Sequence, residues 1–247
     1  MDKFILNGVK DKLHYLEFGK GKPVILIPSL WVTSKTYFVL GREIGKYYHV
    51  YIPDLYCGKS KFENNAIKIE DYIQLLAEFI RKLNIKKYYL VGISLSGIII
   101  AKFLLKYKRL PIKSFLISTT VLPLKLKNQR LFLFRGYIMI LVHNLSSFSG
   151  LKTNWLWISD GLENAWRHFR QALIQGLIAS SVKIENIKRL PVPVKLIFAL
   201  RDEFIPREAV GRLAKVKNLD LETIDGYHGW FFRREKELAL KIRKFFS

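Results

Sequence analysis

The sequence predicts an α/β protein with a mostly parallel sheet and helices on both faces of that sheet. Short apolar runs of strand type alternate with longer runs in which apolar residues recur at helical spacing, an order that is typical of parallel sheets. The alternation stops after residue 121 and resumes after about residue 190, which indicates an insertion and not a second independent domain. With 247 residues, of which 50% are apolar, the chain can form one large core.

The first half of the chain supplies most of the expected strands. Residues 4–18 predict a hairpin, because the turn Asn7-Gly8 separates two apolar stretches. The continuous apolar run 24–27 is typical of a strand buried on both faces. Between residues 67 and 83, apolar side chains recur at helical spacing and leave a polar opposite face. The other expected elements are strands at 48–52, 88–91 and 112–117, and helices at 34–46 and from 95 to about 107.

The second half begins with the insertion. Residues 122–189 contain helical stretches, many aromatic residues and no convincing strand. We therefore expect one core formed by residues 1–121 and 190–247, with residues 122–189 as a helical insertion. The elements expected after the insertion are strands at 194–199 and 219–224, and helices at 206–214 and 235–246.

The charge of the chain is strongly positive. It has 42 Lys and Arg residues against 20 Asp and Glu residues, a formal net charge of +22. Such a balance indicates either an anionic partner, such as a phospholipid surface, or an ordinary solvated surface rich in lysine. The basic residues are scattered among apolar ones and form no recognition-helix pattern, so nucleic-acid binding is not expected.

Several observations concern where the protein resides. Cys57 is the only cysteine, so no internal disulfide can form, which fits the reducing cytosol. The N-terminus has no signal-peptide core, and we expect a cytoplasmic protein. The apolar run 131–145 is too short to span a bilayer. It fits a buried or cavity-lining helix, or a helix that lies on a membrane.

A short Gly/Ser motif follows the strand expected at 88–91. The motif is Gly92-Ile93-Ser94-Leu95-Ser96-Gly97, and an apolar helix is expected directly after it. A sharp turn from a strand into a helix needs small residues, and it exposes the side chain at its apex, here Ser94. The usual pattern is Gly-x-Ser-x-Gly, from which Ser96 departs. The motif predicts a nucleophile elbow at Ser94, with an ordinary strand-to-helix loop as the alternative.

A serine nucleophile needs a base and a third group that orients the base. His228 follows the last expected strand, at the sheet edge where Ser94 emerges, and is the candidate base. Asp202 also follows a strand at this edge and is the candidate acid, with Glu203 and Asp225 as competitors. The remaining histidines lie on expected strands (His14 and His49) or in the insertion (His143 and His168).

Over nearly its full length the sequence resembles the α/β-hydrolase fold superfamily. The order Ser94, Asp202, His228 is the order of nucleophile, acid and histidine in that superfamily. Three loops also resemble its motifs: the acid loop 200–206, which ends in Ile205-Pro206, the histidine turn 226–230, and the shortened loop 54–60, which keeps Asp54, Gly58 and Ser60. The resemblance implies a mostly parallel sheet of the eight-stranded type, and it places residues 122–189 where this superfamily carries its cap or lid.

The resemblance also implies an oxyanion hole formed by backbone N–H groups of Leu30 and Leu95. The superfamily often has His-Gly after its third strand, whereas this chain has Pro28-Ser29. An N–H group can come from any residue except proline, so Leu30 can still donate. No metal or organic cofactor is implied. Serine at the apex argues against the dehalogenases and epoxide hydrolases of the superfamily, whose members use aspartate there.

We therefore expect a serine hydrolase that cleaves a small carboxylic ester through an acyl-enzyme on Ser94. The aromatic and aliphatic residues of the insertion favour an apolar acyl or aromatic substrate, unless they only attach the cap to the core. The alternatives are other chemistry of the superfamily, namely carbon–carbon bond hydrolysis or cofactor-free peroxidase activity, and a non-catalytic binding protein. A lipase-like enzyme on an anionic membrane surface would account for both the cap and the charge.

Overall fold

The computed structural model describes most of the chain. The described residues are 2–6, 11–29, 31–64, 66, 68–108, 110–122, 148–181 and 187–247, and for 148–154 and 176–181 the backbone alone is described.

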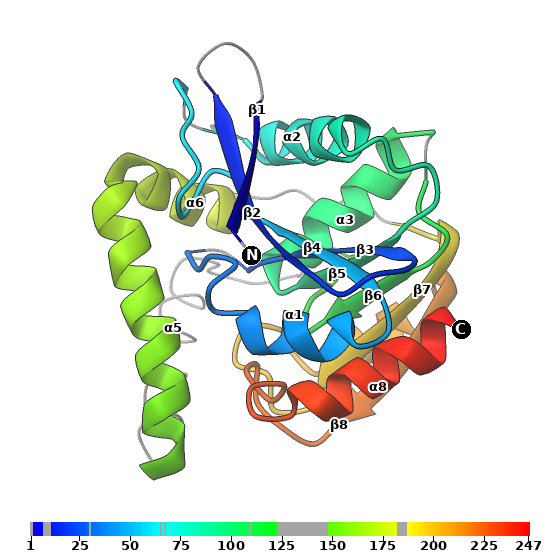
Figure 1. Ribbon diagram of the computed structural model, residues 1–247. Helices are drawn as coiled ribbons and strands as arrows, with labels where there is room; N and C mark the ends of the chain where they lie inside the picture. The colour runs from blue at the N-terminus through cyan, green and yellow to red at the C-terminus, as the bar shows by residue number, and fades with distance from the viewer. Residues whose placement is uncertain are drawn as a thin grey trace.

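One eight-stranded sheet forms the centre of the molecule, in the order β1-β2-β4-β3-β5-β6-β7-β8 (Figure 1). The first two strands pair antiparallel with each other, and β2 pairs antiparallel with β4, whereas all the other pairs are parallel. The chain thus has the mostly parallel sheet that its sequence predicts. The strands are β1 (Asp2–Leu6), β2 (Lys12–Phe18), β3 (Pro23–Ile27), β4 (His49–Pro53), β5 (Tyr89–Ile93), β6 (Ser114–Ile117), β7 (Arg189–Ala199) and β8 (Lys217–Ile224).

Helices cover both faces of the sheet: α2 and α3 lie on one face, and α1 and α8 lie on the other (Figure 1). Consecutive strand residues point to opposite faces. In β3, Ile25 and Ile27 belong to the core cluster beneath α2 and α3, whereas Val24 and Leu26 belong to the cluster beneath α1 and α8. The helices are α1 (Phe38–Gly45), α2 (Ile69–Lys82), α3 (Leu95–Lys106), α5 (Phe148–Arg167), α6 (Phe169–Ser181), α7 (Ala209–Leu213) and α8 (Glu235–Phe246).

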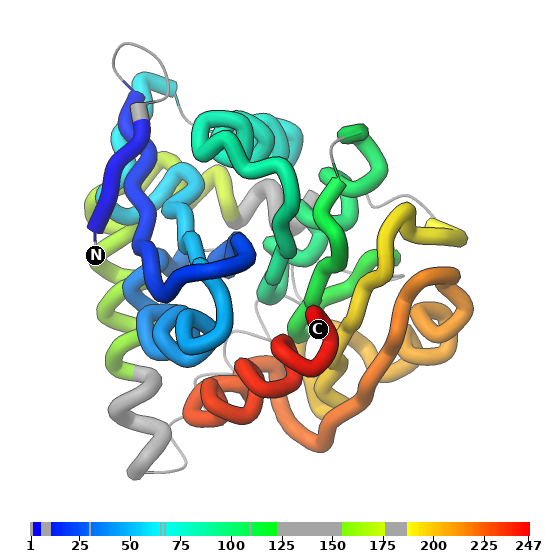
Figure 2. The backbone as a smooth tube through the Cα atoms, turned by 45° about the vertical axis from the view of Figure 1, so that its right-hand side comes forward, coloured from blue at the N-terminus to red at the C-terminus, as the bar shows by residue number. Residues whose placement is uncertain are grey.

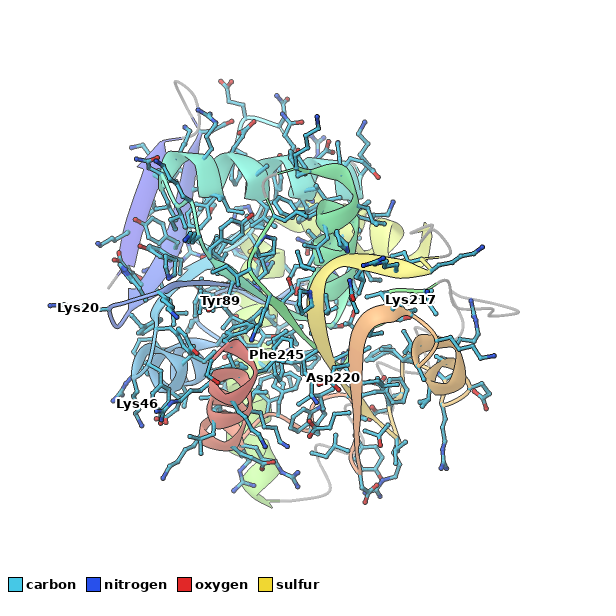
Figure 3. All side chains as sticks on the ribbon, turned by 90° about the vertical axis from the view of Figure 1, so that its right-hand side faces the viewer. Lys20, Lys46, Tyr89, Lys217, Asp220 and Phe245 are labelled. Carbon is cyan, nitrogen blue, oxygen red and sulfur yellow. The ribbon has the colours of Figure 1, made fainter. Side chains whose placement is uncertain are left out.

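The sheet runs from the N-terminal hairpin at one edge to β8 at the other, and the C-terminal helix crosses its face (Figure 2). Lysine side chains are distributed over this scaffold. Lys20, Lys46 and Lys217 come from three different parts of the chain and extend outward from the core (Figure 3).

Two elements begin four or more residues away from the positions that the sequence predicts. Helix α1 begins at Phe38 and not at Ser34, because Thr33, Ser34 and Thr36 donate hydrogen bonds to the carboxylates of Asp54 and Asp160 and remain in a loop. Sequence propensity cannot reveal these distant acceptors.

Strand β7 begins at Arg189, before the strand expected at 194–199. Its first part contains Pro191 and Pro193, which cannot donate to a ladder. The pairing of β7 with β8 is irregular between Arg189 and Val194, and its pairing with β6 begins at Val194. The prolines therefore lie where the ladder is interrupted.

Helices α5 and α6 follow β6 and precede β7, within the range expected for the helical insertion, and they lie beside the sheet in Figure 1. Residues 123–147, which include the apolar run 131–145 and His143, lie outside the described residues. Within the described part of the chain, no helix is both long enough and apolar enough to cross a membrane.

Candidate active site

Ser94 lies at the turn between β5 and α3. Its φ and ψ angles are 57° and −126°, in a region that residues other than glycine rarely adopt. Such backbone strain persists only where the surrounding structure holds it in place. The Ser94 N–H donates to the carbonyl of Ile117 on β6 at 2.9 Å, and the Gly97 N–H donates back to the carbonyl of Ser94 at 3.0 Å. The sharp turn predicted from the motif is therefore present.

Two glycines allow α3 to lie close to β5 and to the loop that follows β6. A Cβ atom added at Gly92 would lie 2.6 Å from Cδ1 of Ile100, and one added at Gly97 would lie 2.4 Å from Cγ2 of Thr119. Ser96, the departure from the usual pattern, has a structural role. Its buried hydroxyl accepts the Ile93 N–H at 2.7 Å and lies 2.8 Å from the carbonyl oxygen of Ile27. The serine thus links the turn to β3.

Replacing Gly97 with alanine is expected to destabilise the protein by about 1–3 kcal/mol, because the added methyl group overpacks the contact with Thr119. Gly211 provides the matched control, since it also lies in a helix but has no atom within 4 Å of an added Cβ. Gly211→Ala is expected to leave stability unchanged or to raise it by about 0.5–1 kcal/mol. Urea unfolding of both variants measures the difference, and equal stabilities would contradict the close packing.

The structure brings Ser94, His228 and Asp202 together at the carboxyl edge of the sheet. The Ser94 Oγ lies 3.0 Å from Nε2 of His228, and Nδ1 of His228 lies 2.9 Å from Oδ2 of Asp202. Because a carboxylate only accepts hydrogen bonds, Nδ1 carries a hydrogen and donates it to Asp202. In the neutral ring, Nε2 is then free to accept the hydrogen of the Ser94 hydroxyl.

The three candidate acids occupy different positions. The Asp202 side chain is fully buried, and its second oxygen, Oδ1, accepts the N–H groups of Phe204 and Ile205 at 2.8 and 3.0 Å. Glu203 accepts the backbone N–H of His228 at 2.8 Å, which is a contact with the main chain of this residue. Asp225 is exposed and pairs with Arg201. Of the three candidates, Asp202 therefore has the contact that orients the ring.

The loop that carries His228 is fixed at both sides of this residue. Glu203 accepts its N–H, and the Ser118 hydroxyl, which follows β6, donates to its carbonyl oxygen at 2.8 Å. Phe204 packs edge-on against the imidazole, with ring centroids 4.8 Å apart. The sequence alone predicts no role for Ser118 and presents Glu203 only as a competing acid. Ser118 lies directly after a strand, at the same sheet edge as Ser94. This position is the sequence feature that indicates a role near the site.

The surroundings of His228 raise its pKa. Burial acts first and lowers the pKa, but the charge and hydrogen bond of Asp202 and the charge of Glu203 outweigh burial, so the net pKa lies above the ordinary value of 6.5. Two carboxylates thus favour the protonated imidazolium, which is the form that a general base acquires when it takes a proton.

Of the two expected oxyanion donors, only Leu95 lies within the described residues. It is the first residue of α3, where N–H groups have no acceptor within the helix and the helix dipole favours negative charge. Leu30 lies outside the described residues. Its neighbour Ser29 forms hydrogen bonds with the buried hydroxyl of Tyr37, which attaches the Pro28-Ser29 segment to the core.

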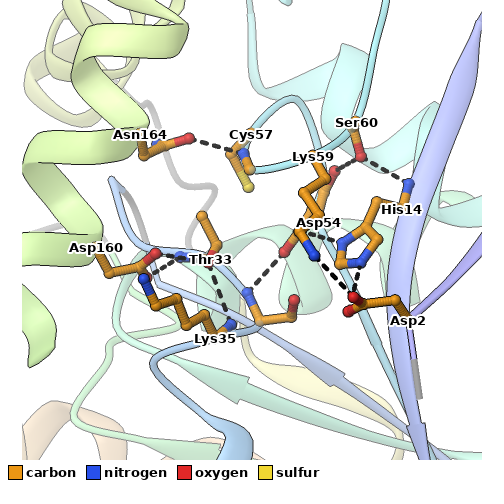
Figure 4. A network of polar contacts seen from close by, with 12 residues as sticks. Asp2, His14, Thr33, Lys35, Asp54, Cys57, Lys59, Ser60, Asp160 and Asn164 are labelled. Atoms are coloured by element: carbon orange, nitrogen blue, oxygen red, sulfur yellow. Dashed lines mark hydrogen bonds and ion pairs between the residues drawn. The ribbon is translucent and has the colours of Figure 1, made fainter.

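A second His–Asp pair lies in a polar network between the core and α5 (Figure 4). Nδ1 of His14 donates to Asp54 at 2.6 Å, and its Nε2 lies 3.1 Å from Asp2. The Ser60 hydroxyl accepts the backbone N–H of His14 and donates to the Asp54 carbonyl, so it does not meet the ring. Both nitrogens of His14 face carboxylates, which supports a structural role for this residue.

The other described histidines also have partners. Nε2 of His49 contacts Glu17 at 2.5 Å, and Nε2 of His168 donates to the Gly58 carbonyl at 2.8 Å. Cys57 is buried, and burial together with the charges of Asp54 and Asp160 raises the pKa of its thiol. Over the described ranges, no group of three His, Cys, Asp or Glu side chains is arranged to hold a metal ion.

Comparison with solved structures identifies the fold. No protein-family model matches the sequence, and no curated protein matches it either. Solved structures do match over nearly the whole chain. An esterase from Exiguobacterium antarcticum is 15% identical, with a TM-score of 0.81 and coverage of 99% of each chain. A thermophilic esterase from Thermogutta terrifontis is 16% identical, with a TM-score of 0.78 and coverage of 100% of this chain and 98% of the other.

A hydrolase named for a different kind of substrate matches to a similar degree. A 2-hydroxy-6-oxo-6-phenylhexa-2,4-dienoate hydrolase from Rhodococcus sp. strain RHA1 is 16% identical, with a TM-score of 0.78 and coverage of 100% of this chain and 99% of the other. Identities this low establish the fold and not the reaction. The eight-stranded sheet with its serine turn, together with these structural matches, shows that the protein has the α/β-hydrolase fold predicted from its motifs.

Proposed function

We propose that the protein is a serine hydrolase that cleaves a carboxylic ester through an acyl-enzyme on Ser94. The observation that carries the proposal is the continuous chain of contacts from the Ser94 hydroxyl through His228 to Asp202. A serine hydroxyl is weakly nucleophilic on its own, and this arrangement supplies both a base and a group that orients the base.

In the first half of the proposed reaction, Nε2 of His228 takes the proton of Ser94 while Oγ attacks the ester carbonyl carbon. The carbonyl oxygen becomes an oxyanion, which the N–H groups of Leu95 and Leu30 stabilise. Each donor contributes on the order of 3 kcal/mol to the transition state. The imidazolium then gives its proton to the leaving alcohol oxygen as the carbon–oxygen bond breaks, and the acyl group remains on Ser94.

In the second half, a water molecule gives a proton to Nε2 of His228 and attacks the acyl carbon. Collapse of the second tetrahedral intermediate breaks the bond to Ser94, which regains its proton from His228 and releases the acid. Throughout both halves Asp202 keeps Nδ1 protonated and stabilises the imidazolium, in agreement with the two carboxylates that raise the pKa of His228. The reaction needs no cofactor.

We further propose that residues 122–189 act as a cap over this site and that the substrate is an apolar acyl or aromatic ester. The second candidate is hydrolysis of a carbon–carbon bond by the same three side chains. Its support is that a dienoate hydrolase and the two esterases match this structure to a similar degree.

A panel of 4-nitrophenyl esters with acyl chains of increasing length tests the proposal, with Ser94→Ala as the blank. We expect hydrolysis that depends on Ser94 and is fastest for one range of chain lengths. If the protein reacts with a fluorophosphonate at Ser94 but hydrolyses vinylogous 1,5-diketones and no ester, the carbon–carbon alternative is correct. Failure of the native protein to react with any of these reagents would favour a binding protein.

The pH dependence of kcat/KM follows from the raised pKa of His228. The proposed base must be neutral in the free enzyme, and a raised pKa means that the ring becomes neutral only at higher pH. We therefore expect kcat/KM to fall on the acidic side with a midpoint above about pH 6.5, the ordinary value for histidine.

The variant Glu203→Gln tests the cause of that midpoint. Glutamine keeps an oxygen for the His228 N–H but removes a negative charge, so the midpoint is expected to move to lower pH. Asp225→Asn is the control, since Asp225 is exposed and paired with Arg201. A midpoint that moves equally in both variants, or that moves upward in Glu203→Gln, would contradict this account of the pKa.

A further inference from the structure

A small pocket of about 20 Å³ lies beside the serine turn. About 10–15 Å³ is sufficient for one water molecule, so this pocket accepts only a small group of atoms. Its walls include Leu95 and Ser96 of the turn and Pro28 and Ser29 of the loop after β3. The rest of the wall is largely apolar, apart from polar side chains such as Tyr72 on α2 and Gln175 on α6.

The Tyr72 hydroxyl has a hydrogen that no described residue accepts. Its oxygen accepts hydrogen bonds from the amide nitrogens of Gln171 and Gln175 at 2.9 and 3.0 Å, which occupies both lone pairs. The side chain is buried, with 4% of its surface exposed, and burial raises the pKa of Tyr72, so the hydroxyl keeps its hydrogen at neutral pH. Tyr72 and Gln175 both line the pocket, and their polar atoms meet through this hydrogen bond.

Gln175 supplies a second hydrogen of the same kind. Its side-chain oxygen accepts the Trp31 N–H at 3.3 Å, which fixes which end of the amide is nitrogen. One hydrogen of that nitrogen goes to Tyr72, and the other has no acceptor among the described residues. Gln171 differs, because its nitrogen donates both to Tyr72 and to the Ala66 carbonyl. Tyr72 and Gln175, whose polar atoms are 3.0 Å apart, thus each keep one unused donor in a buried position.

The chemistry of these donors indicates what the pocket accepts. A buried donor without an acceptor is costly, and an oxygen atom that fills the pocket removes that cost. Among the described residues that line the pocket there is no Lys, Arg or His, so a carboxylate would enter without a compensating charge. The matching group is therefore a neutral acceptor oxygen, such as that of a ketone, an ether or a second ester.

The position of the pocket indicates which side of the substrate carries this oxygen. In the proposed reaction the leaving alcohol must remain within reach of His228, and His228 does not line the pocket. Leu95, whose N–H is proposed to hold the carbonyl oxygen, does line it. The acyl chain continues from the carbonyl carbon that Leu95 holds. We therefore infer that the acyl side of the substrate, and not the alcohol side, enters the pocket.

We propose that Tyr72 and Gln175 form an acyl subsite that selects short acyl groups, apolar except for one neutral acceptor oxygen, an inference that rests on the proposed ester hydrolysis. Neither residue takes part in bond breaking. Both distinguish an acyl group with a keto or ether oxygen from the same chain with a methylene at that position.

The test compares two esters of equal length, 4-nitrophenyl 4-oxopentanoate and 4-nitrophenyl pentanoate, with 4-nitrophenyl 3-methoxypropanoate as a second oxygen position. The ratio of kcat/KM for an oxygen-bearing ester to kcat/KM for the pentanoate is divided by the ratio of the hydroxide-catalysed rates of the same two esters. We expect this corrected ratio to be about ten for at least one oxygen-bearing ester with the native protein. In Tyr72→Phe this corrected ratio is expected to fall to about three, because the hydroxyl donor is lost and only the Gln175 donor remains.

The matched control is Tyr89→Phe, which removes a buried phenol hydroxyl that donates to the Phe246 carbonyl at 3.0 Å on the other face of the sheet. It is expected to keep the native preference. If Tyr72→Phe does not fold, the corrected ratio of the native protein decides, and a ratio near one for both oxygen positions would overturn the inference. A preference that is undiminished in Tyr72→Phe would also overturn it.

Failure of the proposed function gives a different result. If neither the oxygen-bearing esters nor the pentanoate are hydrolysed, and a fluorophosphonate does not label Ser94, then ester hydrolysis itself is wrong and the acyl subsite falls with it. If all three esters are hydrolysed and the corrected ratios of kcat/KM are near one, the protein is a hydrolase and only the proposed subsite is wrong.

Discussion

Replacing Ser94 with alanine is expected to lower kcat for the best ester substrate by on the order of 10⁶-fold, because the attacking oxygen is removed. The fold should persist, since the Ser94 backbone and not its hydroxyl makes the contacts with Ile117 and Gly97 that hold the turn. Alanine keeps the Cβ atom and with it the backbone strain at this position, so stability is expected to be nearly unchanged. Steady-state kinetics on a 4-nitrophenyl ester and a urea unfolding curve measure the two effects.

Ser96→Gly is the companion variant for this experiment. It restores the usual Gly-x-Ser-x-Gly pattern and removes the hydrogen bonds of the Ser96 hydroxyl with Ile93 and Ile27. We expect it to lose about 1 kcal/mol of stability for each hydrogen bond lost and to keep its hydrolytic activity. If Ser96→Gly abolished hydrolysis while Ser94→Ala preserved it, the nucleophile would have been assigned to the wrong serine.

Replacing Asp202 with asparagine is expected to lower kcat by about 10⁴-fold. The amide fits the space of the carboxylate, but it can present its N–H₂ group to Nδ1 of His228 and so favour the wrong tautomer. The loop should keep its shape, because the amide oxygen can still accept the N–H groups of Phe204 and Ile205. Kinetics across pH measure the loss, and the acidic midpoint is expected to fall, since Asp202 contributes most to raising the pKa of His228.

Glu203→Gln provides the comparison for Asp202→Asn. Glu203 contributes charge and a backbone contact, whereas Asp202 contributes charge and the hydrogen bond to the ring. The glutamine variant is therefore expected to lose far less activity than the asparagine variant. An equal loss in both variants would mean that the negative charge alone matters and that the orientation of the ring by Asp202 does not.

Much of the fold could be predicted from the sequence because the core strands are continuous apolar runs. In β3 and β5 consecutive residues are buried against opposite faces of the sheet, and such runs occur only where helices cover both faces. The positions of Ser94, Asp202 and His228 were predictable for a related reason. Each residue follows a parallel strand, and the carboxyl ends of parallel strands meet at one edge of the sheet.

The contacts that refine the site could not be predicted in this way. The choice between Asp202 and Glu203 depends on loop geometry, in which adjacent carboxylates face the ring and the backbone of the same histidine. The role of Ser118 depends on a contact across 110 positions of the chain. The unused hydrogens of Tyr72 and Gln175 become visible only when every partner of both side chains is known.

Covalent labelling tests the central claim most directly. The native protein is treated with a fluorophosphonate, digested and analysed by mass spectrometry, with Ser94→Ala and His228→Ala treated in parallel. We predict one phosphonylated serine, at position 94, with labelling absent in Ser94→Ala and strongly slowed in His228→Ala. Labelling at another residue, or labelling of Ser94 at the same rate without His228, would contradict the proposal that this histidine activates this serine.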